Sequence, residues 1–366
     1  MADIVEKGEG AIALSPTNID SNCLTYEKDN TYISTYKYEE SPEIKIFAGD
    51  IIFVKTGSTV GKVAFVDNII DRTTLNPQLV VLKQVKCNPY FLYLLMAAPC
   101  FQKHIKRITV GGAVPTLSQN EMGRIGITLP PNAEQDRISA LFKLLNYRIE
   151  TQKKIIEDLK KLKDAISKII LSCSDLLEKR VRISEIGTLK NGYAFQSSSY
   201  DSSGKYEIIT IANVTGERYI CSDGCNHIPA KPSDIQPHQE LSVNDILISL
   251  TGNVGRVSLC KEGKFLLNQR VGLLELHAGI NREFVYQVAS SRKFKQSMIS
   301  CSQGAAQMNV GKGDVESFVM PYSSNPLNLQ RIASILRSYD ELIIIEEKRL
   351  RLLLSQKQYL ISAMFI

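Results

Sequence analysis

The longest helical pattern in the sequence is EQDRISALFKLLNYRIETQKKIIEDLKKLKDAISKIILSCSDLL, residues 134–177. No glycine or proline occurs between Pro131 and Gly187, and Pro130-Pro131-Asn132 supplies a stop and a cap in front of the pattern. At about 1.5 Å per residue, such a helix is about 60 Å long, which exceeds the width of a small domain. The stretch therefore predicts a long rod rather than a helix inside one core.

Apolar residues in this stretch recur in alternating steps of three and four, which is typical of a heptad seam. The seam residues are Ile138, Leu141, Leu145, Ile155, Leu159, Leu162, Ile166, Ile169, Cys173 and Leu176. Arg148 and Gln152 stand at the two polar positions in its middle. A rod with one apolar stripe needs a partner to cover that stripe.

The last stretch of the chain, Leu329–Ile366, repeats the pattern. Its residues QRIASI (330–335) match DRISAL (136–141), and Glu346 stands where Gln152 stands in the first copy, at the same offset (332 − 138 = 194; 346 − 152 = 194). We expect these two helices to pack antiparallel as a coiled coil. The alternative is two unrelated surface helices.

The sequence before each long helix is rich in short strand patterns. In the first half, residues 44–47, 51–54, 63–66, 79–82 and 125–129 read as strands and Pro89–Ile105 as a helix. In the second half, residues 244–249, 251–257 and 267–270 repeat blocks of the first half in the same order. We therefore predict an α+β fold with two similar strand-rich domains at 1–131 and 178–322, followed by helices at 132–177 and 323–366.

Composition places the chain among ordinary globular proteins. Its 366 residues are 44% hydrophobic and 22% charged, and a net charge of +6 is compatible with nucleic acid without requiring it. The sequence shows no long apolar run and no signal-peptide layout at its start. Eight cysteines without framework spacing predict reduced thiols and a cytoplasmic location.

Two motifs resemble chemical sites but lack required features. Gly57-Ser58-Thr59-Val60-Gly61-Lys62-Val63 has three residues between its glycines instead of four, and Val63 stands where a P-loop has Ser or Thr. It also leads into a strand, so we interpret it as a β-turn loop. Cys221, Cys225 and His227 lie close together without a second ligand pair, which favours free thiols over zinc. We predict no catalytic and no metal residues.

The polar, glycine-rich loops of both halves carry hydrogen-bond donors suited to DNA. Arg and Lys pair with guanine, Asn and Gln pair with adenine, and loop amides bind phosphate. Solvated loops carry the same residue types, so we expect only some of them to touch DNA. The candidates are Lys55, Thr56, Ser58, Thr59, Lys62, Arg72, Thr73, Asn76, Gln78, Lys190, Asn191, Tyr193, Asn253, Arg256, Asn268, Gln269, Arg270, Gln303, Gln307, Asn309 and Lys312.

In these features the sequence resembles the specificity subunit of type I restriction-modification systems. The resemblance rests on Gly49–Phe53 with Thr56–Phe65, on their repeat at 244–247 and 251–257, and on Leu129-Pro130-Pro131 before Glu134-Gln135. It covers nearly the whole chain. The second copy departs from the pattern because Leu329-Gln330 lacks the glutamate.

The resemblance implies a non-catalytic subunit with two target-recognition domains, each reading one half of a split site in double-stranded DNA. It further implies that the two helices set the spacer and dock two methyltransferase subunits, and that motor-nuclease subunits complete the complex. S-adenosylmethionine, ATP and magnesium are then expected only on those partners, and no cofactor on this chain. Two alternatives stay open: a duplicated adaptor that binds protein, and a methyltransferase or nuclease with unrecognised motifs.

The two halves differ at their starts. When Asn18-Ile19 is aligned with Asn213-Val214, Met1 falls opposite Gln196 (213 − 18 = 195; 196 − 195 = 1). Residues 181–195, which read as a strand at Val181–Ile186 and a polar loop, then have no counterpart in the first domain. An absent strand would expose a sheet edge. We therefore expect the first domain to be the less stable half, either because the true start lies upstream or because the domain is a shortened variant.

Overall fold

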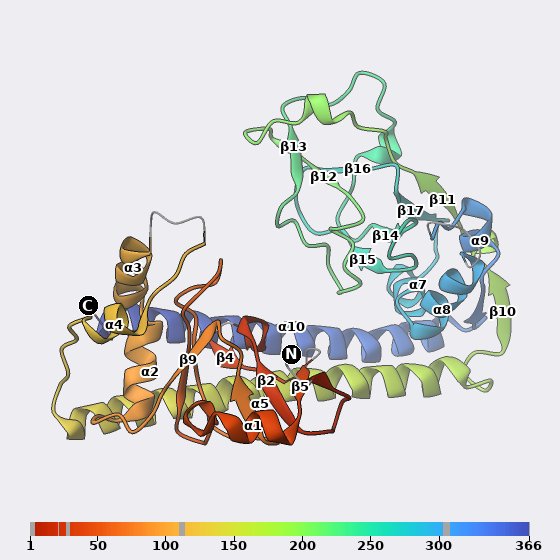
Figure 1. Ribbon diagram of the computed structural model, residues 1–366. Helices are drawn as coiled ribbons and strands as arrows, with labels where there is room; N and C mark the ends of the chain where they lie inside the picture. The colour runs from red at the N-terminus through yellow and green to blue at the C-terminus, as the bar shows by residue number, and fades with distance from the viewer. Residues whose placement is uncertain (1–3, 21, 27–29, 110–113, 303–307, 366) are drawn as a thin grey trace. The chain divides into compact units, whose positions relative to one another are not determined.

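The computed structural model describes residues 4–20, 22–26, 30–109, 114–302 and 308–365. Its contacts group the chain into two compact units, Met1–Lys153 with Arg349–Ile366 and Lys154–Lys348, which we call unit 1 and unit 2. Each unit holds one set of strands and a portion of both long helices (Figure 1). The domain boundaries expected from sequence stay a prediction, because these units divide each helix. No helix among the described residues is long and apolar enough to cross a membrane.

The described residues of unit 1 form two sheets. One has the order β1-β5-β2-β8 and the other β3-β4-β7-β6-β9. The strands are β1 Ile4–Val5, β2 Ala11–Leu14, β3 Ile19–Asp20, β4 Cys23–Leu24, β5 Thr31–Ile33, β6 Ile51–Val54, β7 Val63–Phe65, β8 Thr73–Leu75 and β9 Leu79–Leu82. The short helices are α1 Thr35–Glu40, α2 Pro89–Ala97, α3 Pro99–Ile108 and α4 Gln119–Gly123, with 3-10 turns at Pro16–Asn18 and Pro42–Ile44.

In unit 2, the residues that the structure describes form three sheets, with the orders β10-β18, β11-β17-β14-β15 and β13-β12-β16. The strands are β10 Lys179–Arg182, β11 Gly187–Asn191, β12 Tyr206–Ile209, β13 Asn226–Ile228, β14 Ile246–Ser249, β15 Val257–Leu259, β16 Phe265–Leu267, β17 Val271–Leu276 and β18 Val319–Tyr322. The short helices are α6 Ile183–Ile186, α7 Arg282–Ala289, α8 Arg292–Cys301 and α9 Lys312–Glu316, with 3-10 turns at Ser197–Ser199 and Pro237–Gln239.

The two units repeat one strand arrangement. In unit 1, β6 pairs antiparallel with β7, and the later strand β9 pairs with the other side of β6. In unit 2, β14 pairs antiparallel with β15, and the later strand β17 pairs with the other side of β14. In each, a parallel pair (β2 with β8, β12 with β16) accompanies that sheet. The turn before β6 or β14 also repeats, because Gly49 and Asn244 both have positive φ, at 93° and 67°. The predicted duplication is therefore confirmed.

The long helices are α5, Asn132–Ser172, and α10, Pro326–Met364. In unit 2 they run antiparallel, because Lys160 pairs with Glu347 at 2.8 Å and Lys163 with Asp340 at 2.5 Å. In unit 1, Phe142 of α5 and Ile361 of α10 share one apolar core with α2. The antiparallel pairing predicted from sequence is therefore confirmed where the described contacts define its direction.

The face of α5 that is buried differs from the predicted seam. Leu141, Ile155, Leu162 and Ile169 were expected inside, but all four are exposed. The buried face holds Leu145 and Gln152, as predicted, together with Phe142, Ile149 and Ile156, which lay outside the predicted seam. Of the predicted polar positions, Gln152 lies in the buried face and Arg148 does not. The helix carries apolar residues on two faces, so periodicity alone could not choose between them.

Four predicted elements differ from the structure, for local reasons. Residues 44–47 are not a strand, because Pro42 begins a 3-10 turn. The Ile46 N–H donates to the Thr73 carbonyl, but this single hydrogen bond is not part of a strand pairing. Residues 89–105 form two helices, because Pro99 lacks the N–H that would continue the first. Residues 183–186 are helical, since Glu185 accepts a bond from the Arg182 N–H at 2.6 Å. Residues 125–129 form no strand.

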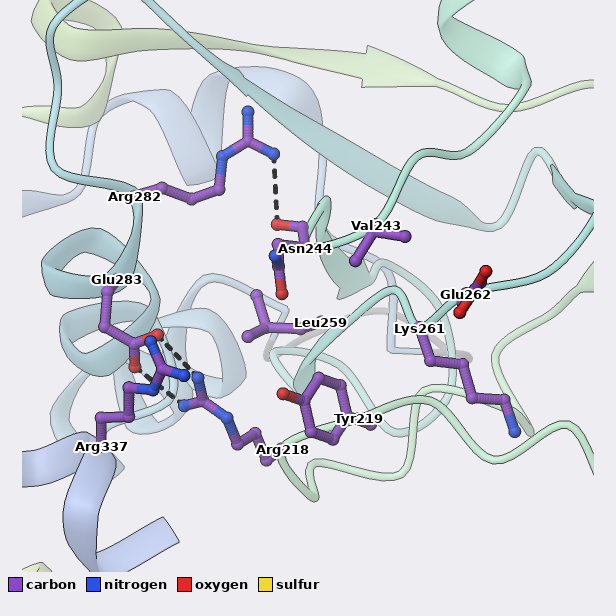
Figure 2. Close-up of a pocket in the computed structure, with 10 residues that line it drawn as sticks. All are labelled: Arg218, Tyr219, Val243, Asn244, Leu259, Lys261, Glu262, Arg282, Glu283 and Arg337. Atoms are coloured by element: carbon purple, nitrogen blue, oxygen red, sulfur yellow. Dashed lines mark hydrogen bonds and ion pairs between the residues drawn. The ribbon is translucent and has the colours of Figure 1, made fainter. Parts of the chain in front are cut away.

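A buried ionic network joins the strands of unit 2 to its helices. Arg218 donates to Glu283 on α7 at 2.8 and 2.6 Å, and to Asp340 on α10 at 3.2 Å. Figure 2 shows Arg218 and Glu283 facing each other beneath the cavity that they help to line. Gln287 also donates to Asp340, at 2.7 Å. Burial by itself raises the pKa of Glu283, but the bonds from Arg218 and Gln287 outweigh it and lower that pKa.

Unit 1 has a neutral counterpart of this network. Asn146 stands on α5 where Asp340 stands on α10, and it donates to the Tyr90 hydroxyl at 2.7 Å. Tyr90 in turn occupies the place of Glu283, since both are the second residue of a helix capped by asparagine. Burial raises the pKa of Tyr90 to about 12, so it stays a neutral phenol. Each set of strands is thus fixed to the helices by its own chemistry.

Candidate DNA-recognition loops

The predicted polar residues of unit 2 gather at one end of its central sheet. Strand register places Asn191, Gly272, Ile248 and Val257 in one row across β11, β17, β14 and β15. The loops beyond this row carry the candidates Tyr193, Asn253, Arg256, Asn268, Gln269 and Arg270. We call this region the unit 2 loop end. The sequence order alone does not bring these residues together, because they come from three separate loops.

Hydrogen bonds tie a fourth segment to the unit 2 loop end. Thr251 forms a bridge with Asn309, and its hydroxyl donates to the Asn309 side chain at 3.2 Å. The Gly252 N–H donates to the Met308 carbonyl at 2.9 Å. Asn309, a candidate from sequence, therefore lies beside the loop after β14.

Tyr193 is the aromatic member of this region. It forms a bridge with Asn268, and its ring lies 4.9 Å from the Phe195 ring. The hydroxyl donates to Asp234 at 2.9 Å, and this bond raises the pKa of Tyr193. Tyr193 therefore keeps its proton at neutral pH.

Arg256 faces a cavity of about 530 Å³ rather than standing free on a loop tip. The cavity is also lined by Arg292 and Lys295 of α8, and by two acids, Asp164 and Glu217. Sequence reasoning missed Arg292 and Lys295 because they stand in a helical pattern. The available signal was the run of basic residues on the polar side of that pattern, which an anion-binding surface would use.

Unit 1 has the same loop end. Register places Val63, Phe53 and Val80 in one row, and the loops beyond it carry Lys55, Thr56, Ser58, Thr59, Asn76 and Gln78. The Lys55 N–H donates to the Gln78 carbonyl at 2.9 Å, and Thr56 forms a bridge with Thr116. The two units thus present equivalent loops with different side chains.

The glycines of the repeated loop serve the turn and its packing. Gly61 and Gly255 have positive φ, at 97° and 71°. A Cβ on Gly255 would lie 2.8 Å from the Met298 Cβ on α8, and one on Gly61 would lie 2.7 Å from Gln102 on α3. Each loop also leads into a strand, β7 or β15. The interpretation as a β-turn loop is confirmed.

Several candidates lie apart from the two loop ends. Arg72 precedes β8, at the opposite end of that strand from Asn76, and Thr73 is fully buried. Lys62 directs its ammonium group to the Ile19 carbonyl at 3.3 Å. Lys190 pairs with Glu275 at 3.4 Å, and Lys312 with Glu316 at 3.6 Å. Gln303 and Gln307 lie outside the described residues.

The other reactive side chains of unit 2 are held in structural contacts. The Cys225 thiol is buried and accepts a bond from the Asn213 amide at 3.1 Å, and burial raises its pKa to about 11. The cavity of about 500 Å³ in Figure 2 is lined by Arg218, Lys261, Arg282 and Arg337. Arg282 is paired with Asp245 and Arg337 with Glu341, so acids within the fold balance these charges.

Comparison with known proteins agrees with this architecture. The family model described as type I restriction modification DNA specificity domain matches residues 6–161 and again 178–354. A curated relative, the type I restriction enzyme MjaX specificity subunit of Methanocaldococcus jannaschii, is 26% identical over 92% of this chain and 80% of its own.

Two solved structures share the fold. The type I restriction-modification S subunit from M. genitalium aligns with a TM-score of 0.57 at 16% identity, over 100% of this chain and 94% of that chain. A chain from a structure on complex assembly and conformational transition of the type I R-M system aligns at 0.56 and 17% identity, over 96% and 90%. The family match covers both halves of the sequence. The chain therefore belongs to the type I restriction-modification DNA specificity family, whose members are the non-catalytic DNA-recognition subunits of these systems.

Proposed function

We propose that the loop end of each unit reads one half of a split site in double-stranded DNA. The observation that carries this proposal is the repetition of one loop scaffold with two different sets of side chains. A repeated loop scaffold that carries different side chains in each unit suits a DNA site whose two halves differ in sequence.

The side chains at the two ends would read DNA differently. The unit 2 loop end offers Arg270, Gln269 and Asn268, whose fork-shaped groups match base edges. The unit 1 loop end offers Lys55, Ser58 and Thr59, which suit phosphates and single hydrogen bonds, and Gln78, which suits adenine. Tyr193 and the basic cavity beside Arg256 would add stacking and phosphate contacts to unit 2.

The long helices would dock the methyltransferase subunits. Both long helices expose apolar residues: on α5 these include Leu141, Ile155, Leu162 and Ile169, which the sequence pattern placed in the seam, and on α10 they include Ile345, Leu352 and Tyr359. Exposed apolar residues repeated along a helix mark a protein interface. Motor-nuclease subunits would complete the complex. S-adenosylmethionine, ATP and magnesium would bind those partners and not this chain.

The experiment is methylome sequencing of host cells that express the chain with its methyltransferase partner. Arg270→Ala should relax one half of the methylated motif and leave the other half unchanged, because a base-reading arginine contributes about 1–3 kcal/mol of discrimination. Arg331→Ala, which changes an exposed residue of α10, is the matched control and should leave the motif intact.

A complementary measurement tests whether the binding partner is DNA. The affinity of the assembled complex for its target duplex should fall steeply with salt, as expected when cations neutralise phosphates. If Arg270→Ala leaves both half-sites unchanged, the assignment of the unit 2 loop end is wrong. Binding that does not depend on salt or sequence would favour the protein-binding adaptor.

A further inference from the structure

Basic residues gather beside the unit 2 loop end, along one side of α8. This helix lines two cavities, one of about 530 Å³ around Arg256 and one of about 670 Å³. The two cavities adjoin, because Arg292 and Gln296 line both of them. We call the cations in their linings the α8 band, and its members are Lys168, Arg180, Arg256, Arg292, Lys293 and Lys295.

Acids of the fold leave most of this charge unbalanced. Two acids line the cavities, Asp164 and Glu217, and Glu217 is itself paired with Lys160 at 3.0 Å. Within the described part of the chain, no cation of the α8 band forms an ion pair. The cavity in Figure 2 differs, since each of its arginines is paired with an acid of the fold. The α8 band therefore favours an anionic ligand.

Unit 1 shows that the fold does not require these charges. A Cβ on Gly61 would meet Gln102 of α3, as one on Gly255 would meet Lys295 of α8, so Gln102 and Lys295 are equivalents. The Gln102 side chain donates to the Gly61 carbonyl at 2.7 Å, whereas Lys295 is exposed. The helix thus packs against the repeated loop with a neutral residue at this position.

The helix α3 is also basic, but at different positions. It has Pro99 and Cys100 in place of Arg292 and Lys293. Its exposed cations stand further along the helix, at Lys103, Lys106 and Arg107. Positive charge thus recurs in the two units without recurring at the same residues. This suits contacts with phosphate, which hold DNA in place without reading its sequence.

Strand register relates the α8 band to the base-reading loop. β15 and β17 pair with opposite sides of β14, so their backbones are about 10 Å apart, which is two strand spacings. Arg256 and Arg270 directly precede these two strands at the same end of the sheet. The major groove of DNA is about 12 Å wide. With Arg270 in the groove, Arg256 therefore reaches the phosphates that border it.

We propose that the α8 band binds the sugar-phosphate backbone of the DNA that flanks the half-site of unit 2. This inference rests on the proposed function and adds a sequence-independent contact to it. The α8 band supplies affinity and position, and the choice of bases is left to Asn268, Gln269 and Arg270. DNA is favoured over an acidic protein segment because the band includes Arg256, which stands at the same sheet end as those base readers.

The test removes three charges of the band in the assembled complex, by Arg292→Gln, Lys293→Gln and Lys295→Gln together. All three residues are exposed, so the apolar face of α8 stays intact. The slope of log affinity for the target duplex against log salt should become less steep by about 2.7, because each lost phosphate contact removes about 0.9. Methylome sequencing should return an unchanged motif.

Two further arms identify the contact. Arg292→Lys with Lys293→Arg and Lys295→Arg keeps every charge, and this matched control should retain the slope and the motif. Neutral methylphosphonate groups in the DNA strand that flanks the half-site should weaken binding of the original complex. They should add little to the triple glutamine variant, because both changes remove the same contact.

The outcomes separate this inference from the proposed function. An unchanged salt slope in the triple glutamine variant would overturn the inference, and the proposed function would still stand on the effect of Arg270→Ala. A changed motif would overturn it too, because the band would then read bases. Loss of partner subunits at unchanged DNA affinity would assign the band to an acidic protein segment. Inorganic phosphate that displaces the duplex at constant ionic strength would assign it to a free anion.

Discussion

Replacing Asp340 by alanine should destabilise unit 2 far more than any exposed charge change on the same helix. The carboxylate accepts from Lys163 at 2.5 Å, from Gln287 at 2.7 Å and from Arg218 at 3.2 Å, and all four residues belong to unit 2. Removing one partner of a buried ion pair typically costs about 3–5 kcal/mol, because the remaining charge is left buried. Arg218 keeps its two bonds to Glu283, so we expect a loss near the lower limit, about 3 kcal/mol.

The assay is native-state hydrogen exchange with mass spectrometry, which reports opening free energies segment by segment. Segments of α7 and of α10 from Pro326 to Lys348 should lose protection, whereas α2 in unit 1 serves as an internal reference. Glu341→Ala is the matched control, since it removes an exposed pair with Arg337 and should cost less than about 1 kcal/mol.

A second substitution sharpens the result. Asp340→Asn places in unit 2 the residue that unit 1 has at Asn146, and its carbonyl oxygen still accepts from Gln287. It should therefore cost less than Asp340→Ala. The reasoning is refuted if Asp340→Ala and Glu341→Ala have the same effect, because the buried network would then not hold the strands of unit 2 to its helices.

Further measurements test other parts of the structure. The N–H of Ser324 and further hydrogen bonds lower the pKa of Glu178 to about 2 from the ordinary value of 4.5. Its contribution to stability is therefore present above pH 4.5 and lost as the pH falls toward 2, and Glu178→Gln should remove that acid dependence from the local hydrogen exchange of β10 and the start of α10. Limited proteolysis should cut within residues 1–45 before residues 178–322, and equal resistance of both halves would contradict the expected weakness of the first domain. An insertion of four residues near Lys160 adds about 6 Å of helix, and the spacer in the methylated motif should lengthen. An unchanged spacer would refute the role of the helices in setting it. Exchange of residues 178–322 for the matching domain of a relative should change one half-site, and a change in both would contradict modular reading.

The sequence by itself determined the features that depend on local pattern and on repetition. The absence of glycine and proline from 132 to 186 predicts the long helix, and the structure places α5 at Asn132–Ser172. The repeated blocks around Asp50 and Asp245 predict the duplication because equal sequence gives equal turns and strands.

The tertiary structure decided what depends on contacts between distant residues. The buried face of α5 holds Ile149 and Ile156 instead of Leu141 and Ile155, because the helix has two apolar stripes and only packing selects one. Strand register, which no local sequence pattern encodes, places Tyr193, Arg270 and Asn309 at one end of the central sheet of unit 2. In unit 1, it places Arg72 at the end of β8 that lies away from the loop end. The ionic contact of Arg218 with Asp340 joins residues far apart in sequence, and their ordinary residue types gave no signal of it. The local sequence pattern thus determines which helices and strands form, whereas packing between distant residues determines which faces are buried and which loops lie side by side.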